Sequence, residues 1–155
     1  MKRCPYNCLT CPYVLPGKQV TSSATNFKHE IESPVNCQTE NLVYCINCNK
    51  CKEQYVGESE KTLSIRFSQH RGYVNCNQLE KSTGEHFNQP GHKLSDMNVT
   101  VLEKVHSKDP FMRKVRESHF IKKMNTKYKG MNKKLWNDNC IFFFLLKLFP
   151  FRYRS

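Results

Sequence analysis

Cys48 and Cys51 are separated by two residues and stand between two short strand-like segments of the chain. A pair of thiolates with this spacing at the tip of a hairpin forms half of a tetrahedral zinc site. Further along, a Pro-Gly turn can fold His92 back toward His86, and the five residues between these histidines are at the long end of zinc-site spacing. The two pairs together predict metal binding.

Five further side chains have types that suit the cleavage of a phosphodiester bond. They are Tyr44 and Tyr55 on the two strand-like segments, Arg66 and Glu117 on two expected helices, and Asn132 near the end of the second. Cleavage requires an activated water, compensation of charge on the phosphate and help for the departing oxygen. Each residue taken singly also has a common structural role: the tyrosines can pack across a hairpin, and Glu117 can pair with Arg113 one turn back. As an ordered set, they favour DNA cleavage.

A β-hairpin is predicted over residues 41–57, because Val, Tyr and Ile favour strands and Asn-Lys provides a turn. Alternation places Leu42, Tyr44 and Ile46 on one face of the first strand. In the second strand Tyr55 and Gly57 share a face, and Gly57 leaves space for another backbone or a ligand to approach. A third strand is expected over residues 97–106.

Two helices are expected to carry the charged candidates. The first covers residues 60–73, with Ser59 or Thr62 as its N-cap. Arg66 and His70 are four residues apart on it, which sets a cation beside an imidazole, although an ordinary solvated face is the alternative. The second helix opens at Asp109-Pro110 and stops near Gly130. Its expected buried stripe is Phe111, Val115, His119, Phe120 and Met124.

The composition favours a polyanionic partner and a reducing compartment. The 155 residues have room for one compact domain, and 25 Lys and Arg oppose 13 Asp and Glu, a formal charge of +12 that is spread along the chain. A basic protein without such a partner is the alternative. Nine cysteines cannot all pair within one chain, and the N-terminus has no signal-like apolar core. We therefore expect an intracellular, nuclear protein, in preference to a secreted disulfide protein.

The two ends of the chain differ from its centre. Residues 1–40 form a cysteine-bearing N-terminal segment, in which a second zinc site and free thiols on a loosely ordered arm are equally open alternatives; the candidate ligands are Cys4, Cys8, Cys11 and Cys37. Residues 137–155 form an apolar and basic tail whose apolar run is too short to span a membrane. The tail is expected to lie outside the functional domain as a truncated or readthrough end, with an interfacial membrane anchor as the alternative.

The order of these motifs resembles the GIY-YIG endonuclease domain, in the form attached to Penelope-like retroelements. Leu42-Val43-Tyr44 stands at the first motif and Tyr55-Val56-Gly57 at the second. Further matches are Arg66, His70, Glu117, the closing Gly130-Met131-Asn132, and the ligand set Cys48, Cys51, His86 and His92. The resemblance covers about residues 4–136. Leu42 replaces a glycine and Val56 an isoleucine, but neither change removes a reacting group. Cys45 adds a third cysteine near the knuckle, which leaves the choice of zinc thiolates open.

The resemblance implies an α+β fold with a small three-stranded antiparallel sheet flanked by helices, and a zinc knuckle in the first hairpin. It places the nuclease domain at residues 41–136. The four ligands of the knuckle would close the coordination shell, so this zinc is expected to be structural.

The resemblance also implies roles for the candidate residues. Tyr44 would position or deprotonate the water; because a free tyrosine has a pKa of about 10, it would need the nearby charge of Arg66, which could also stabilise the pentavalent phosphate. Glu117 would bind Mg²⁺ or Mn²⁺. The remaining roles are a hydrogen bond from Tyr55, proton relay or phosphate contact by His70, and orientation of neighbouring groups by Asn132.

The function expected from these features is divalent-metal-dependent nicking of DNA by an endonuclease derived from a retroelement. The partner is DNA; no small-molecule substrate and no membrane partner are expected. The alternative is a catalytically inactive, zinc-stabilised nucleic-acid-binding module. The absence of a reverse transcriptase and the unusual tail favour this alternative, whereas the complete set of candidate site residues opposes it.

Overall fold

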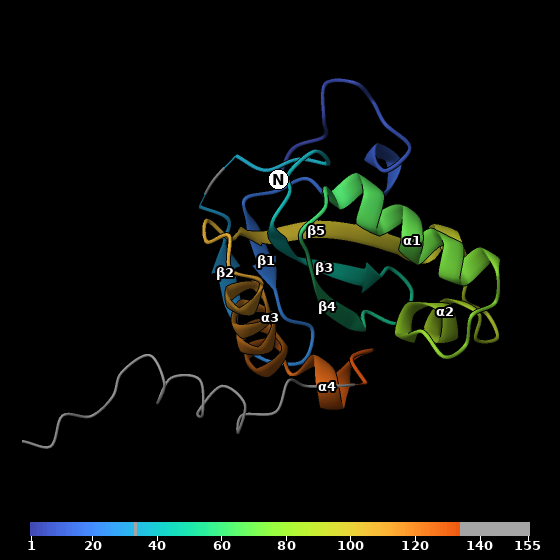
Figure 1. The fold of residues 1–155 in the computed structure, drawn as a ribbon. Helices are drawn as coiled ribbons and strands as arrows, with labels where there is room; N and C mark the ends of the chain where they lie inside the picture. The colour runs from blue at the N-terminus through green and yellow to red at the C-terminus, as the bar shows by residue number, and fades with distance from the viewer. Residues whose placement is uncertain (33, 134–155) are drawn as a thin grey trace, which may run out of the picture.

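A three-stranded antiparallel sheet lies at the centre of the chain (Figure 1). The computed structural model describes residues 1–32 and 34–133. The strands are β3 (Leu42–Cys48), β4 (Gln54–Ser59) and β5 (Met97–Lys104), and β3 lies between the other two. The predicted α+β architecture is confirmed. The predicted tail over residues 137–155 lies outside the described residues.

The central strand β3 is buried on both faces, which explains why nearly all of its residues are apolar. Leu42, Tyr44 and Ile46 point to the same face, as their alternation predicted, and pack against Leu63 and Phe67 of the first helix. Tyr44 lies opposite Gly57 of β4 in the strand register. The face that carries Tyr44 is therefore the one that α1 covers.

The first helix is α1 (Leu63–Asn75), and only one of its two predicted N-caps is correct. Thr62 is its N-cap and accepts a hydrogen bond from the backbone nitrogen of Ile65 at 3.4 Å. Ser59 is not a cap, because β4 continues through it and pairs it with Leu42. A short helix, α2 (Ser82–Phe87), packs beside α1 on the same side of the sheet (Figure 1). A 3₁₀ turn, Leu94–Asp96, then leads into β5.

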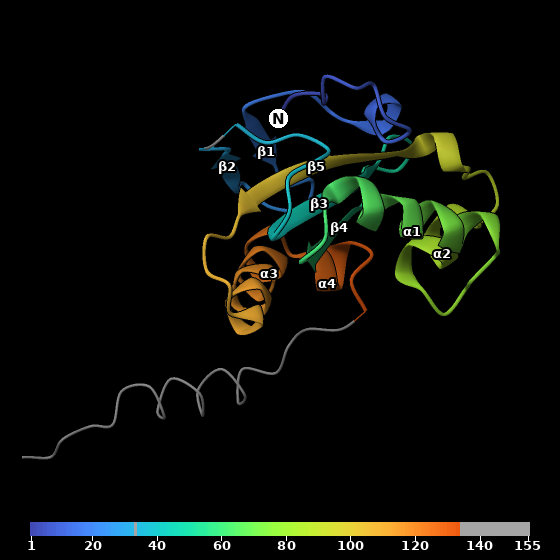
Figure 2. The same ribbon diagram turned by 45° about the horizontal axis from the view of Figure 1, so that its top comes forward.

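The second predicted helix, α3 (Pro110–Met124), covers the opposite face of the sheet (Figure 2). Asp109 caps it as predicted, by accepting a hydrogen bond from the backbone nitrogen of Phe111 at 2.9 Å. The predicted buried stripe is only partly right. The buried residues of α3 are Arg113, Ser118, Phe120, Ile121 and Met124. Of the predicted stripe, Phe111, Val115 and His119 are only half-buried.

The stripe differs because a buried ion pair takes one inner position of α3. Arg113 donates hydrogen bonds to Glu58 of β4 at 2.9 Å and to Asn41 at 2.7 Å, so its charge is compensated on the inner side of the helix. The helix also ends before Gly130, since Asn125 adopts a left-handed conformation with φ 55° after Met124. A further turn, α4 (Thr126–Lys129), precedes Gly130.

The N-terminal segment packs onto the sheet. It contains a 3₁₀ turn (Cys11–Tyr13) and a small hairpin of β1 (Gln19–Thr21) and β2 (Lys28–Glu30). The backbone nitrogen of Leu15 donates to Val99 of β5 at 3.0 Å, and the Ser22 hydroxyl donates to the carbonyl of Met124 at 3.0 Å. Residues 1–40 thus share the core of the sheet, and the division of the chain near residue 40 stays a prediction.

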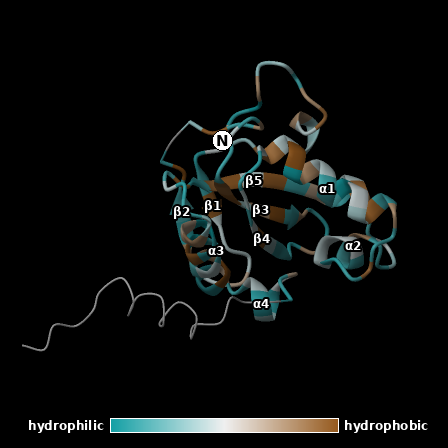
Figure 3. Ribbon diagram, in the orientation of Figure 1, coloured by the Kyte–Doolittle hydropathy of each residue, from teal (hydrophilic) through white to brown (hydrophobic). Residues whose placement is uncertain are grey.

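Hydrophobic residues follow β3, β5 and the start of α1 (Figure 3). Their concentration in the centre of the molecule agrees with the two buried clusters on either side of the sheet. Within residues 1–32 and 34–133, helices long and apolar enough to cross a bilayer are absent.

Candidate active site and metal centres

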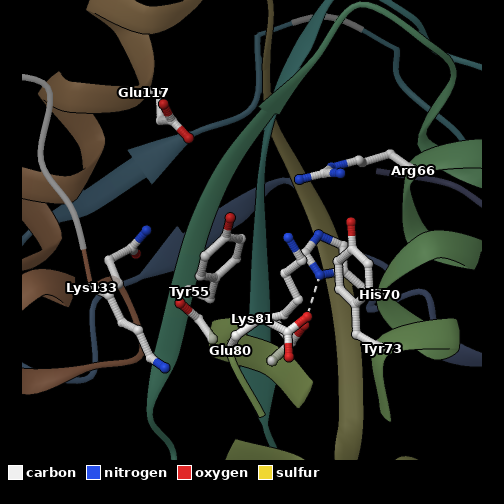
Figure 4. Close-up of a pocket in the computed structure, with 11 residues that line it drawn as sticks. Tyr55, Arg66, His70, Tyr73, Glu80, Lys81, Glu117 and Lys133 are labelled. Atoms are coloured by element: carbon white, nitrogen blue, oxygen red, sulfur yellow. Dashed lines mark hydrogen bonds between the residues drawn. The ribbon is translucent and has the colours of Figure 1, made fainter. Parts of the chain in front are cut away.

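Five of the six candidate catalytic side chains converge on one pocket of about 360 Å³. Figure 4 shows Glu117 of α3 on one side of it, Arg66 of α1 on the other, and Tyr55 of β4 between them. His70 and Asn132 also line the pocket. The residues come from four separate parts of the chain, and the fold brings them together as their ordered motifs predicted. Their catalytic roles stay predictions.

Tyr44 lies behind the wall of this pocket and is fully buried. Its phenol oxygen accepts a hydrogen bond from Arg66 Nε at 2.9 Å and lies 2.7 Å from His70 Nε2. Burial, followed by the nearby Tyr55, raises the pKa of Tyr44 well above its ordinary value, and the charge of Arg66 only opposes this shift. Tyr44 is therefore a neutral phenol, and its position disfavours the water-activating role that the resemblance implies for it.

Gly57 gives the Tyr44 phenol its space. A Cβ atom at this position would lie 2.5 Å from the Tyr44 oxygen and 2.9 Å from a ring carbon of Tyr55. The sequence predicted that another backbone or a ligand approaches Gly57 closely. In the structure the Tyr44 side chain makes this approach.

Replacing Gly57 by Ala is expected to displace both tyrosines and to destabilise the domain by about 2 kcal/mol through overpacking. Gly72 is the matched control, because a Cβ there meets nothing within 4 Å. Gly72→Ala should raise stability by about 0.5–1 kcal/mol, since alanine favours a helix interior. Urea unfolding of both variants measures the two effects. Equal stability changes of the same sign would contradict the tight packing around Gly57.

Tyr55 is the tyrosine that faces the pocket. Its ring lies 6.4 Å from that of Tyr44 and 5.4 Å from that of His70, measured between centroids. Burial and then the carboxylate of Glu117 raise its pKa, which Arg66 partly offsets. The Tyr55 phenol therefore also stays protonated, and it can orient a water molecule in the pocket through a hydrogen bond.

His70 is buried and neutral. Its Nδ1 lies 2.8 Å from the hydroxyl oxygen of Thr83 on α2, and the dashed line in Figure 4 marks this contact. Burial, followed by the charge of Arg66, lowers the pKa of His70 to about 3. A neutral imidazole that is bonded at both nitrogens connects α1, α2 and β3.

Glu117 is the half-buried carboxylate of the pocket. Burial, followed by repulsion from Glu58, raises its pKa to about 7. The alternative that Glu117 pairs with Arg113 does not account for it, because Arg113 bonds Glu58 and also lies 3.9 Å from Glu60. A carboxyl group whose pKa is raised this far by its surroundings is typical of a functional site.

Asn132 joins the C-terminal end of the described chain to β4. Its side-chain amide donates to the Val56 carbonyl at 2.8 Å and accepts from the Val56 backbone nitrogen at 2.8 Å. Val56 lies between Tyr55 and Gly57, so Asn132 fixes the backbone that carries the pocket tyrosine. This position suits the predicted role of orienting neighbouring groups.

Sequence reasoning missed several pocket residues: Tyr73, Glu80, Lys81, Ser82, Thr83 and Lys133. Tyr73 follows His70 by three residues on α1, and helical spacing could have placed it on the same face. Lys81 and Lys133 belong to segments with no periodic pattern, and only the net charge indicated cations near the site.

The four predicted knuckle ligands form one cluster in which all ligand atoms lie within 4.8 Å of one another; they are Cys48, Cys51, His86 and His92. The distance from Cys51 Sγ to His86 Nε2 is 3.5 Å. Tetrahedral zinc with a Zn–S bond of about 2.3 Å and a Zn–N bond of about 2.0 Å requires about 3.5 Å between such atoms. Both ring nitrogens of His92 are buried and have no hydrogen-bond partner among the described residues. The donor set and its geometry therefore fit zinc.

The surroundings of this cluster hold it in place. His86 Nδ1 faces Glu53 at 3.5 Å, as in many zinc sites where a carboxylate orients the ligand. Lys50 at the hairpin tip donates a hydrogen bond to the carbonyl of Gly91 in the Pro-Gly turn, which folds back as predicted. Cys45 does not belong to the cluster, because it points to the opposite face of the sheet, among the residues packed against α3.

The N-terminal cysteines form a second cluster with the same 4.8 Å limit: Cys4, Cys8, Cys11 and Cys37. Sγ of Cys11 lies 3.4 Å from that of Cys4, 3.7 Å from that of Cys8 and 3.7 Å from that of Cys37. Four thiolates around tetrahedral zinc lie about 3.8 Å apart. Of the two alternatives left open by the sequence, this arrangement fits zinc better than a loosely ordered arm.

The comparisons with known proteins agree at the level of a family. The sequence model of the GIY-YIG catalytic domain matches residues 40–132, more than half of the chain. The match includes both tyrosines, the pocket residues up to Asn132 and the ligands of the knuckle cluster, and it begins after the N-terminal cysteines. No curated protein and no solved structure shows significant similarity to the chain.

Proposed function

The chain belongs to the GIY-YIG catalytic domain family, a family of nucleases that hydrolyse phosphodiester bonds, and we propose that it is a divalent-metal-dependent DNA endonuclease that nicks one strand. The observation that carries this proposal is the convergence of Tyr55, Arg66 and Glu117 on one pocket from β4, α1 and α3. These three groups supply a phenol, a guanidinium and a carboxylate, which together can handle water, phosphate charge and a metal ion.

Glu117 is the residue that would hold the divalent ion, Mg²⁺ or Mn²⁺. A pocket lined, among the described residues, by only two protein carboxylates, Glu117 and Glu80, suits Mg²⁺, which keeps most of its hydration shell. When bound, the ion supplies Lewis-acid polarisation of the phosphate and neutralises the departing 3′ oxygen. GIY-YIG nucleases generally use divalent metals, and the fit of this pocket rests on the position of the half-buried Glu117 carboxylate in its wall.

Other side chains of the pocket would supply the remaining catalytic functions. Tyr55 orients the attacking water through its phenol, because it faces the pocket and its raised pKa keeps it protonated. Arg66 compensates charge on the pentavalent phosphate, and Tyr44 holds its Nε at 2.9 Å. Lys81 lines the pocket and is placed to contact a neighbouring phosphate of the strand (Figure 4). Lys133 also lines the pocket, but its charge is paired with Glu85 at 2.6 Å.

The two tyrosines are expected to respond differently to loss of the hydroxyl. Tyr55→Phe should slow cleavage by about 100-fold with little change in stability. Tyr44→Phe leaves the buried Nε2 of His70 and the half-buried Nε of Arg66 without their partner, and should lower the free energy of unfolding by roughly 1–3 kcal/mol. Cleavage rates and thermal unfolding of both variants measure this. Full activity of Tyr55→Phe, with inactive but fully stable Tyr44→Phe, would return the water-activating role to Tyr44.

We propose structural zinc at both cysteine-containing clusters. The knuckle zinc would join the hairpin tip to α2 and to the turn before β5, and would so fix β4 relative to α1. The N-terminal zinc would join residues 4–11 to Cys37, whose carbonyl accepts a hydrogen bond from Ser64 at the start of α1 at 2.8 Å. Both ions would thus support the elements that carry the pocket.

The origin and setting of the protein belong to the same proposal. The combination of a knuckle inside the first hairpin and cysteines before the domain supports descent from a Penelope-like retroelement, with residues 41–136 as the nuclease unit. A DNA substrate and free thiols suited to metal binding support a nuclear location.

The deciding experiment incubates the purified protein with supercoiled plasmid, with and without Mg²⁺. Nicking converts the plasmid to the relaxed circle only when Mg²⁺ is present. Conversion directly to linear DNA would refute single-strand nicking. Salt-sensitive binding without cleavage under Mg²⁺ or Mn²⁺ would refute the nuclease and favour the inactive binding module.

A further inference from the structure

We propose that Thr83 is a positioning residue of the active site: its hydroxyl accepts the Nδ1 hydrogen of His70 and so stabilises the tautomer whose Nε2 orients the Tyr44 phenol, and through it the guanidinium of Arg66. This inference rests on the proposed function, because the guanidinium is the group that contacts the phosphate. Thr83 lies on α2, outside all the motifs that the sequence suggested.

A buried chain of hydrogen bonds begins at Thr83. Its hydroxyl oxygen lies 2.8 Å from His70 Nδ1, His70 Nε2 lies 2.7 Å from the Tyr44 oxygen, and Arg66 Nε donates to that oxygen at 2.9 Å. Thr83, His70 and Tyr44 are at most 2% exposed. Water therefore cannot substitute for the two contacts among these three side chains, and each of their polar atoms depends on its protein partner. Arg66 itself is half-buried.

The direction of each hydrogen bond follows from the Arg66 end of the chain. Arg66 Nε always donates, so the phenol oxygen accepts there. Among the described residues, the other partner of that oxygen is His70 Nε2, which is therefore the acceptor open to the phenol hydrogen. With Nε2 unprotonated, a neutral His70 carries its hydrogen on Nδ1 and donates it to Thr83.

The far end of the chain is the guanidinium in the pocket. Arg66 Nη1 donates to Gln69 at 2.7 Å, and its Nε bond to Tyr44 fixes the plane of the group. In Figure 4 this guanidinium faces the pocket across from Glu117. Thr83 thus acts on the reaction through His70 and Tyr44, since a change of the His70 tautomer removes the acceptor that orients the phenol.

The helix that carries Thr83 also carries a knuckle ligand. His86 follows Thr83 by three residues, so both side chains lie on one side of α2. The same short helix therefore faces His70 with Thr83 and faces Cys51 with His86. This placement gives the knuckle cluster a direct structural connection to the Tyr44–Arg66 pair.

The test uses Thr83→Val, which keeps the side-chain shape but removes the acceptor, and Thr83→Ser, which restores it. Thr126→Val is the matched control, because Thr126 is 1% exposed and its hydroxyl has no partner among the described residues. The first readout is the ¹⁵N chemical shifts of the His70 ring, which report its tautomer in the absence of DNA. The second is the rate of plasmid nicking with Mg²⁺, alongside DNA affinity.

Thr83→Val leaves the Nδ1–H of this tautomer without an acceptor, so the variant is expected to populate the Nε2–H tautomer as well and to nick about tenfold more slowly at unchanged DNA affinity. Thr83→Ser should restore both. Thr126→Val should match the wild type. An unchanged tautomer in Thr83→Val, or an equal loss of rate in Thr126→Val, would overturn the proposal. If the wild-type protein does not cut DNA, the proposed function fails, while the tautomer measurement still decides the role of Thr83.

Discussion

Replacing Glu117 by Gln is expected to abolish nicking, with a loss on the order of 10³-fold or more, while DNA binding changes little. Gln has nearly the same shape but cannot provide the anionic oxygen that a divalent ion requires. DNA affinity should persist because it depends on the many cations of the chain, whose formal charge is +12. Plasmid nicking and DNA binding by the same preparation at several Mg²⁺ concentrations measure both quantities.

Glu103→Gln provides the control for this substitution. Glu103 lies on β5 outside the pocket and pairs with Arg116 at 2.6 Å, so its loss removes a carboxylate of similar exposure without touching the site. It should nick DNA at close to the wild-type rate. Undiminished cleavage by Glu117→Gln would remove Glu117 from the site, and weak DNA binding by that variant would show that its carboxylate acts on folding or binding instead.

Glu117→Gln is expected to lower activity but to raise the stability of the folded protein. The folded chain holds the Glu117 proton up to about pH 7, whereas an unfolded carboxyl loses it near its ordinary pKa. Stability therefore falls as pH rises between these values and stays lower above them. Glu117→Gln lacks this loss and should exceed the wild type by about 2 kcal/mol at pH 8, with a smaller difference at pH 5. Thermal unfolding without added Mg²⁺ at both pH values tests this.

Local patterns predicted the parts of the fold that depend on local physics. Alternation in β3 placed Tyr44 on the same face as Leu42 and Ile46, and Asp109 before Pro110 marked the start of α3. The choice between Ser59 and Thr62 as N-cap could not be made locally. It depends on how far β4 pairs with β3, which is a contact between distant residues. The phase of the α3 stripe failed for the same reason, since Arg113 is buried by partners on another strand.

The candidate site shows the same division. Spacing located Arg66 and His70 on one helix face, and both turned out to contact the same phenol oxygen. The burial of that phenol was not predictable, because charge reasoning alone suggested that Arg66 would lower the pKa of Tyr44. Thr83 escaped notice because a single threonine in a short helix has no periodicity or spacing that marks it. Its proposed role depends only on its contact with His70, which the tertiary structure creates.

Removal of zinc is expected to unfold the domain and not merely to slow catalysis. Structural zinc contributes about 10–16 kcal/mol of apparent binding free energy in small zinc domains, which equals or exceeds the whole stability of about 5–15 kcal/mol typical of a domain. Here the knuckle ion would join β3, α2 and the turn before β5, so its loss releases both sides of the pocket. A strong chelator should therefore eliminate the cooperative thermal transition in circular dichroism.

Matched substitutions separate zinc loss from loss of a side chain. His92→Ala should reduce the zinc content from two ions per chain to one and lower the melting temperature steeply, whereas His106→Ala, at an exposed histidine outside both clusters, should change neither. Cys51→Ser and Cys76→Ser form a second such pair, because both thiols are exposed but only Cys51 belongs to a cluster. If chelator-treated protein keeps its melting temperature, neither cluster holds a structural ion. The position of Tyr55 relative to Arg66 would then depend on the packing of β4 and α1 alone.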